Sequence, residues 1–182
     1  VQFAVAGDGA VGKTSLILRL VNSSWEHAMV HSAYGAYECD ITVNNEPMKV
    51  SFHDTAGEDD FSPSREVAFA NADTILLCYS IISPPSFENI TEKWLPEIKA
   101  ANPKCKIILV ATKADLRNEQ SILERLNERG FSPIATKQGK TKAKSIGASF
   151  IETDKSTSMD DFIPLFTEGN KSKKKKNGCS IV

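Results

Sequence analysis

Gly7-Asp8-Gly9-Ala10-Val11-Gly12-Lys13-Thr14 is the stretch that decides the fold, because it matches the pattern G-x-x-x-x-G-K-[ST] at every fixed position. In this pattern, successive backbone N–H groups turn inward around a polyphosphate, and glycine allows the required backbone angles without a side chain in the way. We expect Lys13 to reach the terminal phosphates and the hydroxyl of Thr14 to bind Mg²⁺ at the start of a helix. The sequence therefore predicts a phosphate-binding loop.

The residues on either side of the loop support this interpretation. The segment from Val1 to Ala6 predicts a short buried strand. After the loop comes an apolar helical face that consists of Leu16, Ile17, Leu18, Leu20 and Val21. Strand, loop and helix thus follow one another in the order that the motif requires. The alternative is a glycine-rich turn that binds nothing, and this context disfavours it.

Composition indicates one soluble globular domain, since the 182 residues are 41% hydrophobic and 25% charged. Five of the 22 lysines and arginines, and none of the 23 acids, lie from Lys171 onward, so the first 170 residues carry a formal charge of −6. We find no run long enough to span a membrane and expect no secretory leader. The cysteines show no close pairing or metal-ligand spacing, which favours reduced thiols in the cytosol for Cys39, Cys78, Cys105 and Cys179.

A hairpin is predicted in the first half of the chain. Two strands, Tyr37 to Val43 and Glu46 to Phe52, flank Asn44-Asn45, a residue pair that tolerates positive φ. The hairpin ends at Asp54-Thr55-Ala56-Gly57, where an aspartate can hold Mg²⁺ through water and a glycine lets its N–H approach a γ-phosphate. By itself this tetrapeptide fits an ordinary turn and helix cap equally well. The preceding segment, Asn22 to Tyr37, reads as an exposed, mobile loop.

Two continuous apolar runs, Thr74 to Tyr79 and Lys106 to Ala111, predict parallel strands covered on both faces. Between them, Pro85 to Ala100 predicts a helix that Pro96 should bend or shorten. The later elements expected are a charged surface helix at Asn118 to Arg129, a helix at Lys137 to Ile146, a strand at Ala148 to Glu152 and a short helix at Met159 to Phe166 that contains Pro164.

A base-reading motif follows the second apolar run. In Thr112-Lys113-Ala114-Asp115, the Asp115 carboxylate can accept hydrogen bonds from N1–H and the exocyclic amine of guanine, while the stem of Lys113 packs on the base. Adenine has no such pair of donors on that edge, so Asp115 would select guanine. The alternative is an ordinary strand-to-helix loop with an exposed charge pair.

The end of the chain fits a lipid anchor. Cys179-Ser180-Ile181-Val182 matches C-a-a-X with Ser180 at a normally aliphatic position, which predicts prenylation of Cys179. The lysine run Lys173 to Lys176 supplies a second signal, because each lysine adds about 1 kcal/mol of attraction near an anionic leaflet. One lipid chain holds only marginally, whereas chain and charge together hold stably. A chance cysteine four residues from the end is the alternative.

With these three loops in this order, the chain resembles the Ras superfamily of small GTPases, and within it the Rho/Rac-like family. The residues that carry this resemblance are Gly7 to Ile17, Asp54 to Gly57, Ser83-Pro84 with Ser86 to Asn89, and Thr112 to Arg117. It implies an α/β P-loop NTPase fold with a six-stranded, mostly parallel sheet flanked by helices. We therefore expect a GTPase domain at 1–168, with a Rho-type insert helix near 118–129, and a polybasic tail at 169–182.

The resemblance also implies the ligands and partners. Expected cofactors are GTP or GDP and Mg²⁺, with metal ligands from Thr14, Ser32 and, through water, Asp54. Switch I would span about Trp25 to Tyr37 and switch II about Asp54 to Phe69, and both would meet effector, exchange and activating proteins. We expect no nucleic-acid partner and a location at the cytoplasmic face of a membrane. The implied nucleotide-binding residues are Gly7, Gly9, Ala10, Val11, Gly12, Lys13, Thr14, Ser15, Trp25, Ser32, Asp54, Gly57, Thr112, Lys113, Asp115 and Lys155.

Departures from the family pattern concern turnover and base binding. Catalysis is expected from Lys13 and Glu58, but Glu58 occupies the position of the glutamine that orients the attacking water. An ionised glutamate only accepts hydrogen bonds, so we expect slow hydrolysis; the alternative is that Glu58 acts as a base. In the last guanine loop, Lys155 must supply a backbone N–H. The rival functions are a pseudo-GTPase binding module and an ATP-dependent kinase, and Asp115 disfavours the kinase.

Overall fold

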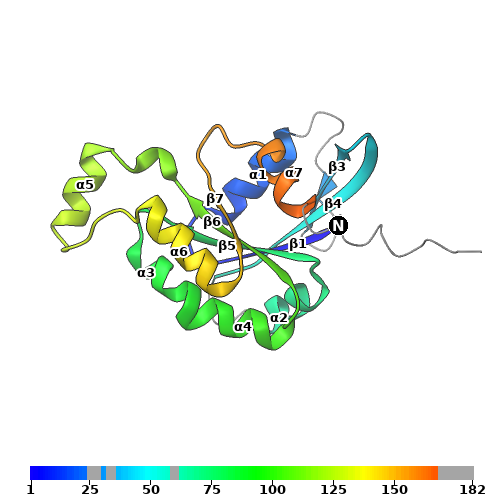
Figure 1. Ribbon diagram of the computed structural model, residues 1–182, viewed down its shortest axis with the longest axis horizontal. Helices are drawn as coiled ribbons and strands as arrows, with labels where there is room; N and C mark the ends of the chain where they lie inside the picture. The colour runs from blue at the N-terminus through cyan, green and yellow to red at the C-terminus, as the bar shows by residue number, and fades with distance from the viewer. Residues whose placement is uncertain (24–29, 32–35, 58–61, 168–182) are drawn as a thin grey trace, which may run out of the picture.

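The computed structural model describes residues 1–23, 30–31, 36–57 and 62–167, which form one sheet covered by helices on both faces (Figure 1). The strand order is β2-β3-β4-β1-β5-β6-β7. Strand β3 pairs antiparallel with β2 and β4, and every other pairing is parallel. The strands are β1 (Gln2–Ala6), β2 (Val30–His31), β3 (Ala36–Val43), β4 (Glu46–Asp54), β5 (Thr74–Ser80), β6 (Lys106–Thr112) and β7 (Ser149–Glu152).

The predicted six-stranded, mostly parallel sheet is confirmed for the six longer strands. The two-residue strand β2 adds a seventh strand at the edge, inside the segment expected to be a loop. That segment was also drawn too long, because helix α1 (Lys13–Ser23) continues through Asn22 and β3 begins at Ala36. The hairpin turn is confirmed, since φ is 54° at Asn44 and 65° at Asn45.

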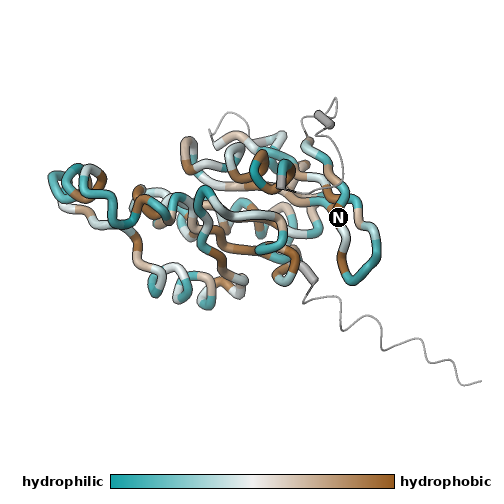
Figure 2. The backbone as a smooth tube through the Cα atoms, turned by 90° about the horizontal axis from the view of Figure 1, so that it is seen from above, coloured by the Kyte–Doolittle hydropathy of each residue, from teal (hydrophilic) through white to brown (hydrophobic). Residues whose placement is uncertain are grey.

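Helices divide between the two faces of the sheet (Figure 1). One face carries α1 and α7 (Met159–Thr167), and the other carries α2 (Ser62–Asn71), the continuous run α3 (Pro84–Asn89), η2 (Ile90–Trp94) and α4 (Leu95–Ala101), and α6 (Thr136–Ile146). Between β6 and α6, the short turn η3 (Ala114–Leu116) is followed by α5 (Gln120–Asn127), which projects from one end of the molecule. Helix α5 is shorter than the predicted range of 118–129, and Figure 2 shows it as a largely hydrophilic protrusion.

The alternation of side chains along the strands explains the continuous apolar runs in the sequence. In β5, Leu76 and Cys78 pack on the α1 and α7 side, whereas Ile75 and Leu77 pack on the other side. Every residue of β5 is buried, as expected for a parallel strand with helices on both faces. The phosphate-binding stretch therefore connects β1 to α1, and both of these elements pack in the hydrophobic core. No helix in the described residues is both long and apolar enough to cross a membrane.

Pro96 does not end the helix between β5 and β6 but changes its winding. A proline lacks an N–H and its ring clashes with the carbonyl four residues earlier. The turn just before it, η2, is a π-helix in which the N–H of Leu95 donates to the carbonyl of Ile90. The wider turn accommodates Pro96, and the helix resumes as α4. Pro164 lies within α7, which nevertheless runs to Thr167. Helix α2 was not anticipated in the predicted switch II.

Candidate nucleotide site

The phosphate loop packs against the backbone of β5 at Gly7. A side chain at Gly7, where φ is +137°, would place its Cβ 2.2 Å from the carbonyl oxygen of Cys78, so only glycine fits there. At Gly9, a Cβ would meet no described atom within 4 Å, so the requirement for glycine seen at position 7 does not extend to this position. Burial raises the pKa of Cys78 to about 12, so its thiol stays protonated at neutral pH, and it donates to the carbonyl oxygen of Leu76 at 3.8 Å.

The side chain of Lys13 is held by carbonyl oxygens of the phosphate loop. Its ammonium group donates to the carbonyl oxygens of Gly7 and Asp8, at 2.8 Å each, and the residue is only 8% exposed. Thr14 and Ser15 follow at the first turn of α1, whose N-terminus carries the positive end of the helix dipole. Ala10, Gly12, Lys13, Thr14, Ser15 and Lys113 line one cavity beside the loop. Backbone N–H groups, an ammonium and a helix N-terminus thus converge as a polyphosphate requires.

Thr14 and Asp54 form a pair that fits Mg²⁺. The hydroxyl of Thr14 donates to Oδ2 of Asp54, which lies at the end of β4 beside Val5 of β1. The other carboxylate oxygen, Oδ1, is buried and has no hydrogen-bond partner among the described residues. A buried unpaired carboxylate oxygen is costly unless water or a cation satisfies it. Among the described residues, Thr14 and Asp54 are thus the ones that would hold the ion together with phosphate oxygens.

Gly57 lies against the phosphate loop itself. A Cβ at this position would be 2.5 Å from the backbone nitrogen of Gly9 and 2.8 Å from the carbonyl carbon of Asp8. The approach is fixed upstream, where the hydroxyl of Thr55 donates to the carbonyl oxygen of Val5 at 2.7 Å. Glycine is therefore required here for close backbone approach. The approach of its N–H to a γ-phosphate stays a prediction.

The base-reading motif is tied directly to the phosphate loop. The hydroxyl of Thr112 donates to the carbonyl oxygen of Val11 at 2.5 Å, and the ammonium of Lys113 donates to that of Ala10 at 2.9 Å. Lys113 adopts a left-handed conformation with φ of +62°, which turns the chain from β6 into η3. The stem of Lys113 consequently crosses the space between the two loops, where we expect it to pack on a base.

Asp115 and Lys155 both line a second cavity, which has a volume of ≈ 280 Å³. Their side chains form an ion pair at 3.5 Å between Nζ and Oδ2, and that of Lys155 is 84% exposed. The cavity is lined by Val11, Gly12, Ser15, Leu16, Arg19, Thr112, Lys113, Asp115, Leu116, Thr153, Asp154 and Lys155. The contact of the Lys155 side chain with the base-reading carboxylate was not predicted from the sequence, where only the backbone N–H of Lys155 was expected to contribute.

Two arginines that the sequence analysis missed support the last guanine loop. Arg19 on α1 donates to the carbonyl oxygen of Asp154, and Arg117 pairs with Glu152 at the end of β7. The hydroxyl and N–H of Ser156 donate to the Asp154 carboxylate and lower its pKa below the usual 3.8. Arg19 lies four residues beyond Ser15 in an apolar helix, and this spacing was the available signal. No local pattern marks Arg117 as a partner of Glu152.

Four predicted site residues lie outside the described residues. These are Trp25 and Ser32 of switch I, Glu58 after Gly57, and Cys179 in the tail, together with the lysine run 173–176. The remaining predicted residues lie along one edge of the sheet, at the carboxyl ends of β1, β4 and β6 and in the loop after β7. That edge is where ligands of open parallel sheets bind.

The fold and this site define a P-loop nucleotide-binding domain with a guanine-reading motif. A comparison with family models matches the Ras family over residues 2–165. The chain belongs to the Ras family. It is therefore a small GTP-binding switch domain of a family whose members bind GTP or GDP with Mg²⁺.

Proposed function

We propose that this chain is a Rho-like, membrane-anchored switch whose GTP hydrolysis is slow because Glu58 replaces the catalytic glutamine. The observation that carries the proposal is the contact of Gly57 with the phosphate loop, where an added Cβ would lie 2.5 Å from the nitrogen of Gly9. Glu58 directly follows Gly57 in the sequence. We therefore expect its carboxylate to take the place of the side-chain amide of the catalytic glutamine.

The chemistry of the Glu58 carboxylate explains why we expect slow GTP hydrolysis. Glutamine both accepts a hydrogen bond from the attacking water and donates one to phosphate oxygens, whereas ionised glutamate only accepts. The negative charge also opposes the γ-phosphate, and two like unit charges at ~4 Å cost about 4 kcal/mol at an effective dielectric near 20. Both effects raise the barrier to hydrolysis and weaken the response to an activating protein. The protein would therefore spend longer in its GTP form.

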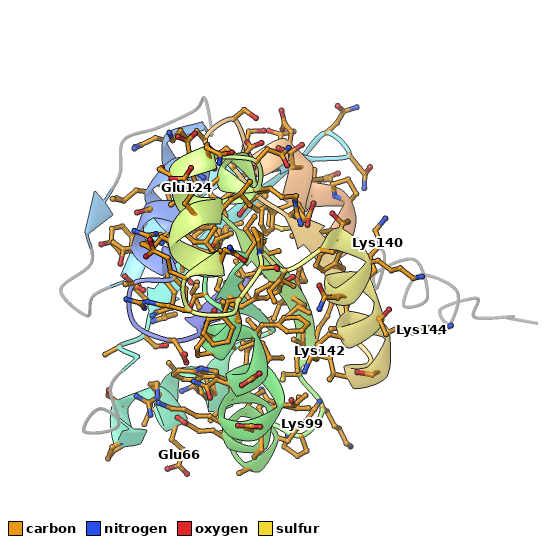
Figure 3. All side chains as sticks on the ribbon, turned by 90° about the vertical axis from the view of Figure 1, so that its left-hand side faces the viewer. Glu66, Lys99, Glu124, Lys140, Lys142 and Lys144 are labelled. Atoms are coloured by element: carbon orange, nitrogen blue, oxygen red, sulfur yellow. The ribbon has the colours of Figure 1, made fainter. Side chains whose placement is uncertain are left out.

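Rho-like character is supported by the motifs around the site and by the position of α5. This helix lies between the base-reading turn η3 and helix α6, where the Rho-like family carries its insert helix, and it projects from the body of the domain (Figure 1). Its outer face is charged and exposed, with Glu124 pointing outward (Figure 3). A projecting, charged helix that follows the base-reading turn in the sequence offers a second contact surface for partners beside the two switches.

Membrane anchoring rests on the tail sequence. A prenyl group on Cys179 and the four lysines Lys173 to Lys176 provide the two signals that stable attachment requires. The body, with a charge of −6 over the first 170 residues, is repelled from an anionic leaflet, so contact falls to the tail. The switch would then act at the cytoplasmic face of a membrane.

A pseudo-GTPase binding module is the second candidate, and the Asp115–Lys155 ion pair favours it. The carboxylate that reads guanine already has a cationic partner at 3.5 Å. If guanine cannot displace this partner, the domain would bind nucleotide weakly and its partners would not depend on nucleotide state. The nucleotide content of the purified protein separates the two candidates.

The decisive experiment is single-turnover hydrolysis of preloaded GTP by the full chain and by a Glu58→Gln variant, after bound nucleotide has been identified by chromatography. We expect the variant to be at least tenfold faster, equivalent to about 1.4 kcal/mol of barrier. Equal rates would mean that Glu58 is not a brake. Absence of bound guanine nucleotide in both proteins would favour the pseudo-GTPase. A matched control, Glu124→Gln, removes an exposed carboxylate on α5 that lines neither nucleotide cavity, and it should leave the rate unchanged.

A further inference from the structure

Asp8, at one of the variable positions of the phosphate loop, is held by two side chains from the far helix. The indole N–H of Trp94 donates to Oδ1 of Asp8 at 2.7 Å, and the amide nitrogen of Asn89 donates to Oδ2, also at 2.7 Å. Trp94 is completely buried. Hydrogen bonds to a charged group are about twice as strong as those between neutral groups. Both carboxylate oxygens of a phosphate-loop residue are thus fixed by side chains that do not line the nucleotide cavities.

The π-turn η2 makes this double contact possible. Asn89 and Trp94 are five residues apart, and an α-helix with 3.6 residues per turn would place them roughly 140° apart around its axis. Between them lies η2, whose five-residue hydrogen-bonded turn brings positions i and i+5 to nearly the same side. The same turn accommodates Pro96. The local widening of the helix, a feature often found at functional sites, therefore aims two donors at one loop residue.

The ring of Trp94 also contacts two cations that hold the start of switch II. The ammonium of Lys93 lies 4.7 Å from the ring centroid and donates to the carbonyl oxygen of Gly57 at 3.1 Å. The guanidinium of Arg65 lies 5.2 Å from the centroid and donates to the carbonyl oxygen of Ala56 at 3.0 Å. Trp94 is therefore placed between the phosphate loop and the backbone just before Glu58.

Arg65 is anchored as firmly as Trp94. It is 1% exposed, and its guanidinium pairs with Glu97 of α4 through Nε at 2.7 Å and Nη2 at 3.3 Å. Its neighbour Glu66 points away from α2 into solvent (Figure 3). The buried cluster thus includes residues from α2, η2 and α4, and a movement of the carbonyls of Ala56 or Gly57 has to move these side chains.

We propose that Asn89 and Trp94 are positioning residues that fix the phosphate loop through Asp8 and couple its geometry to the start of switch II. The proposal rests on nucleotide binding by this domain, but not on the rate of hydrolysis. Loss of either donor leaves a carboxylate oxygen of Asp8 unpaired, and the loop then loses part of the geometry that aligns its N–H groups with phosphate. Faster nucleotide release is the expected consequence.

A donor and acceptor exchange tests the Asn89 contact. Asn89→Asp places two carboxylates against each other, so GDP release should accelerate at least about tenfold, the factor that corresponds to 1.4 kcal/mol. The double variant Asp8→Asn with Asn89→Asp restores a donor and an acceptor in reversed order, and its release rate should return to within about threefold of wild type. The matched control is Asn127→Asp, which adds a charge at an exposed position on α5. A merely structural role of Asn89 would give no rescue.

Trp94→Phe tests the second contact, because it keeps an aromatic ring between the two cations but removes the indole N–H. We expect release about tenfold faster, in line with one hydrogen bond to a charged group. Ile98→Val, a buried change on the same helical run, serves as the control for general destabilisation. It should lower the melting temperature without changing the release rate.

The coupling to switch II has a spectroscopic signature. The chain has two tryptophans, so Trp25→Phe leaves Trp94 as the only indole emitter. In that background, exchanging GDP for a non-hydrolysable GTP analogue should shift the Trp94 emission, and Lys93→Met should reduce the shift. The proposal is overturned if Asn89→Asp releases GDP at the wild-type rate or if the double variant shows no rescue. It is also overturned if the emission of Trp94 does not change when GDP is exchanged for the GTP analogue. If wild type itself retains no guanine nucleotide, it is the proposed function that fails.

Discussion

The two halves of the nucleotide site are built differently. On the phosphate side, Lys13 is 8% exposed and bonded to two loop carbonyls, and Gly7 packs against the backbone of β5. On the base side, Asp115 faces an ion-pair partner, Lys155, whose side chain is 84% exposed. The residues that would hold the phosphates belong to the protein core, whereas those that would hold the base are surface side chains. We infer that the first group is insensitive to small changes nearby and that the second accounts for the individual properties of this chain.

The largest effect should come from breaking the phosphate side. Lys13→Met removes one of the two lysines that line the cavity beside the phosphate loop, and it removes both bonds to the loop carbonyls. Two hydrogen bonds involving a charged group are worth about 3 kcal/mol or more, so GTP affinity should fall at least about a hundredfold. Titration with a fluorescent GTP analogue measures it. Lys144→Met, on the outer face of α6 (Figure 3), is the matched control and should bind normally.

A much smaller effect of opposite sign is expected on the base side. Guanine has to displace the ammonium of Lys155 from Asp115, so Lys155→Met should slow GDP release. Exposed ion pairs contribute about 0.2–1 kcal/mol, which limits the change to about fivefold. Stopped-flow release of labelled GDP at low and high salt provides the measurement, and the difference between variant and wild type should shrink at high salt. Faster release in the variant would mean that the ammonium contacts the base.

The smallest effect concerns the pH dependence of the last guanine loop. Hydrogen bonds from Ser156 lower the pKa of Asp154, so their contribution to the folded loop is complete above the usual pKa of 3.8 and is lost as pH falls through the lowered value. Asp154→Asn should therefore change GDP release by only about twofold, equally at pH 7 and pH 5. A wild-type release rate that rises between pH 7 and pH 5, with a flat profile in the variant, would contradict the lowered pKa.

Local sequence patterns predicted the fold and the residues of the site that follow strand ends. Each of three local patterns indicates a backbone conformation within a few residues. These patterns are the glycine pattern of the phosphate loop, the apolar runs of β5 and β6, and the Asn44-Asn45 turn. Such patterns can be read from one sequence, because the physical cause and the residues that satisfy it are neighbours. The mostly parallel sheet followed from them and is confirmed.

The supporting side chains could not be predicted in the same way. Asp8 meets Trp94 across 86 positions of sequence, and Arg19 meets Asp154 across 135. These contacts depend on how the helices pack, which no local period records. Helix α2 was missed because its apolar positions are few and because it begins with Ser62-Pro63, a pair of residues that is also typical of a turn. Long-range partners of polar residues are thus the part of this site that only the structure supplies.

The most direct test of the account is the choice of base, because Asp115 is its central residue. Xanthine carries a carbonyl where guanine carries the exocyclic amine, so an asparagine at position 115 can donate where aspartate accepts. Competition of GTP, XTP and ATP against labelled GDP should show that wild type prefers GTP at least tenfold. Asp115→Asn should invert the preference between GTP and XTP. An unchanged preference in Asp115→Asn, or a wild-type protein that binds ATP as well as GTP, would contradict base reading by Asp115.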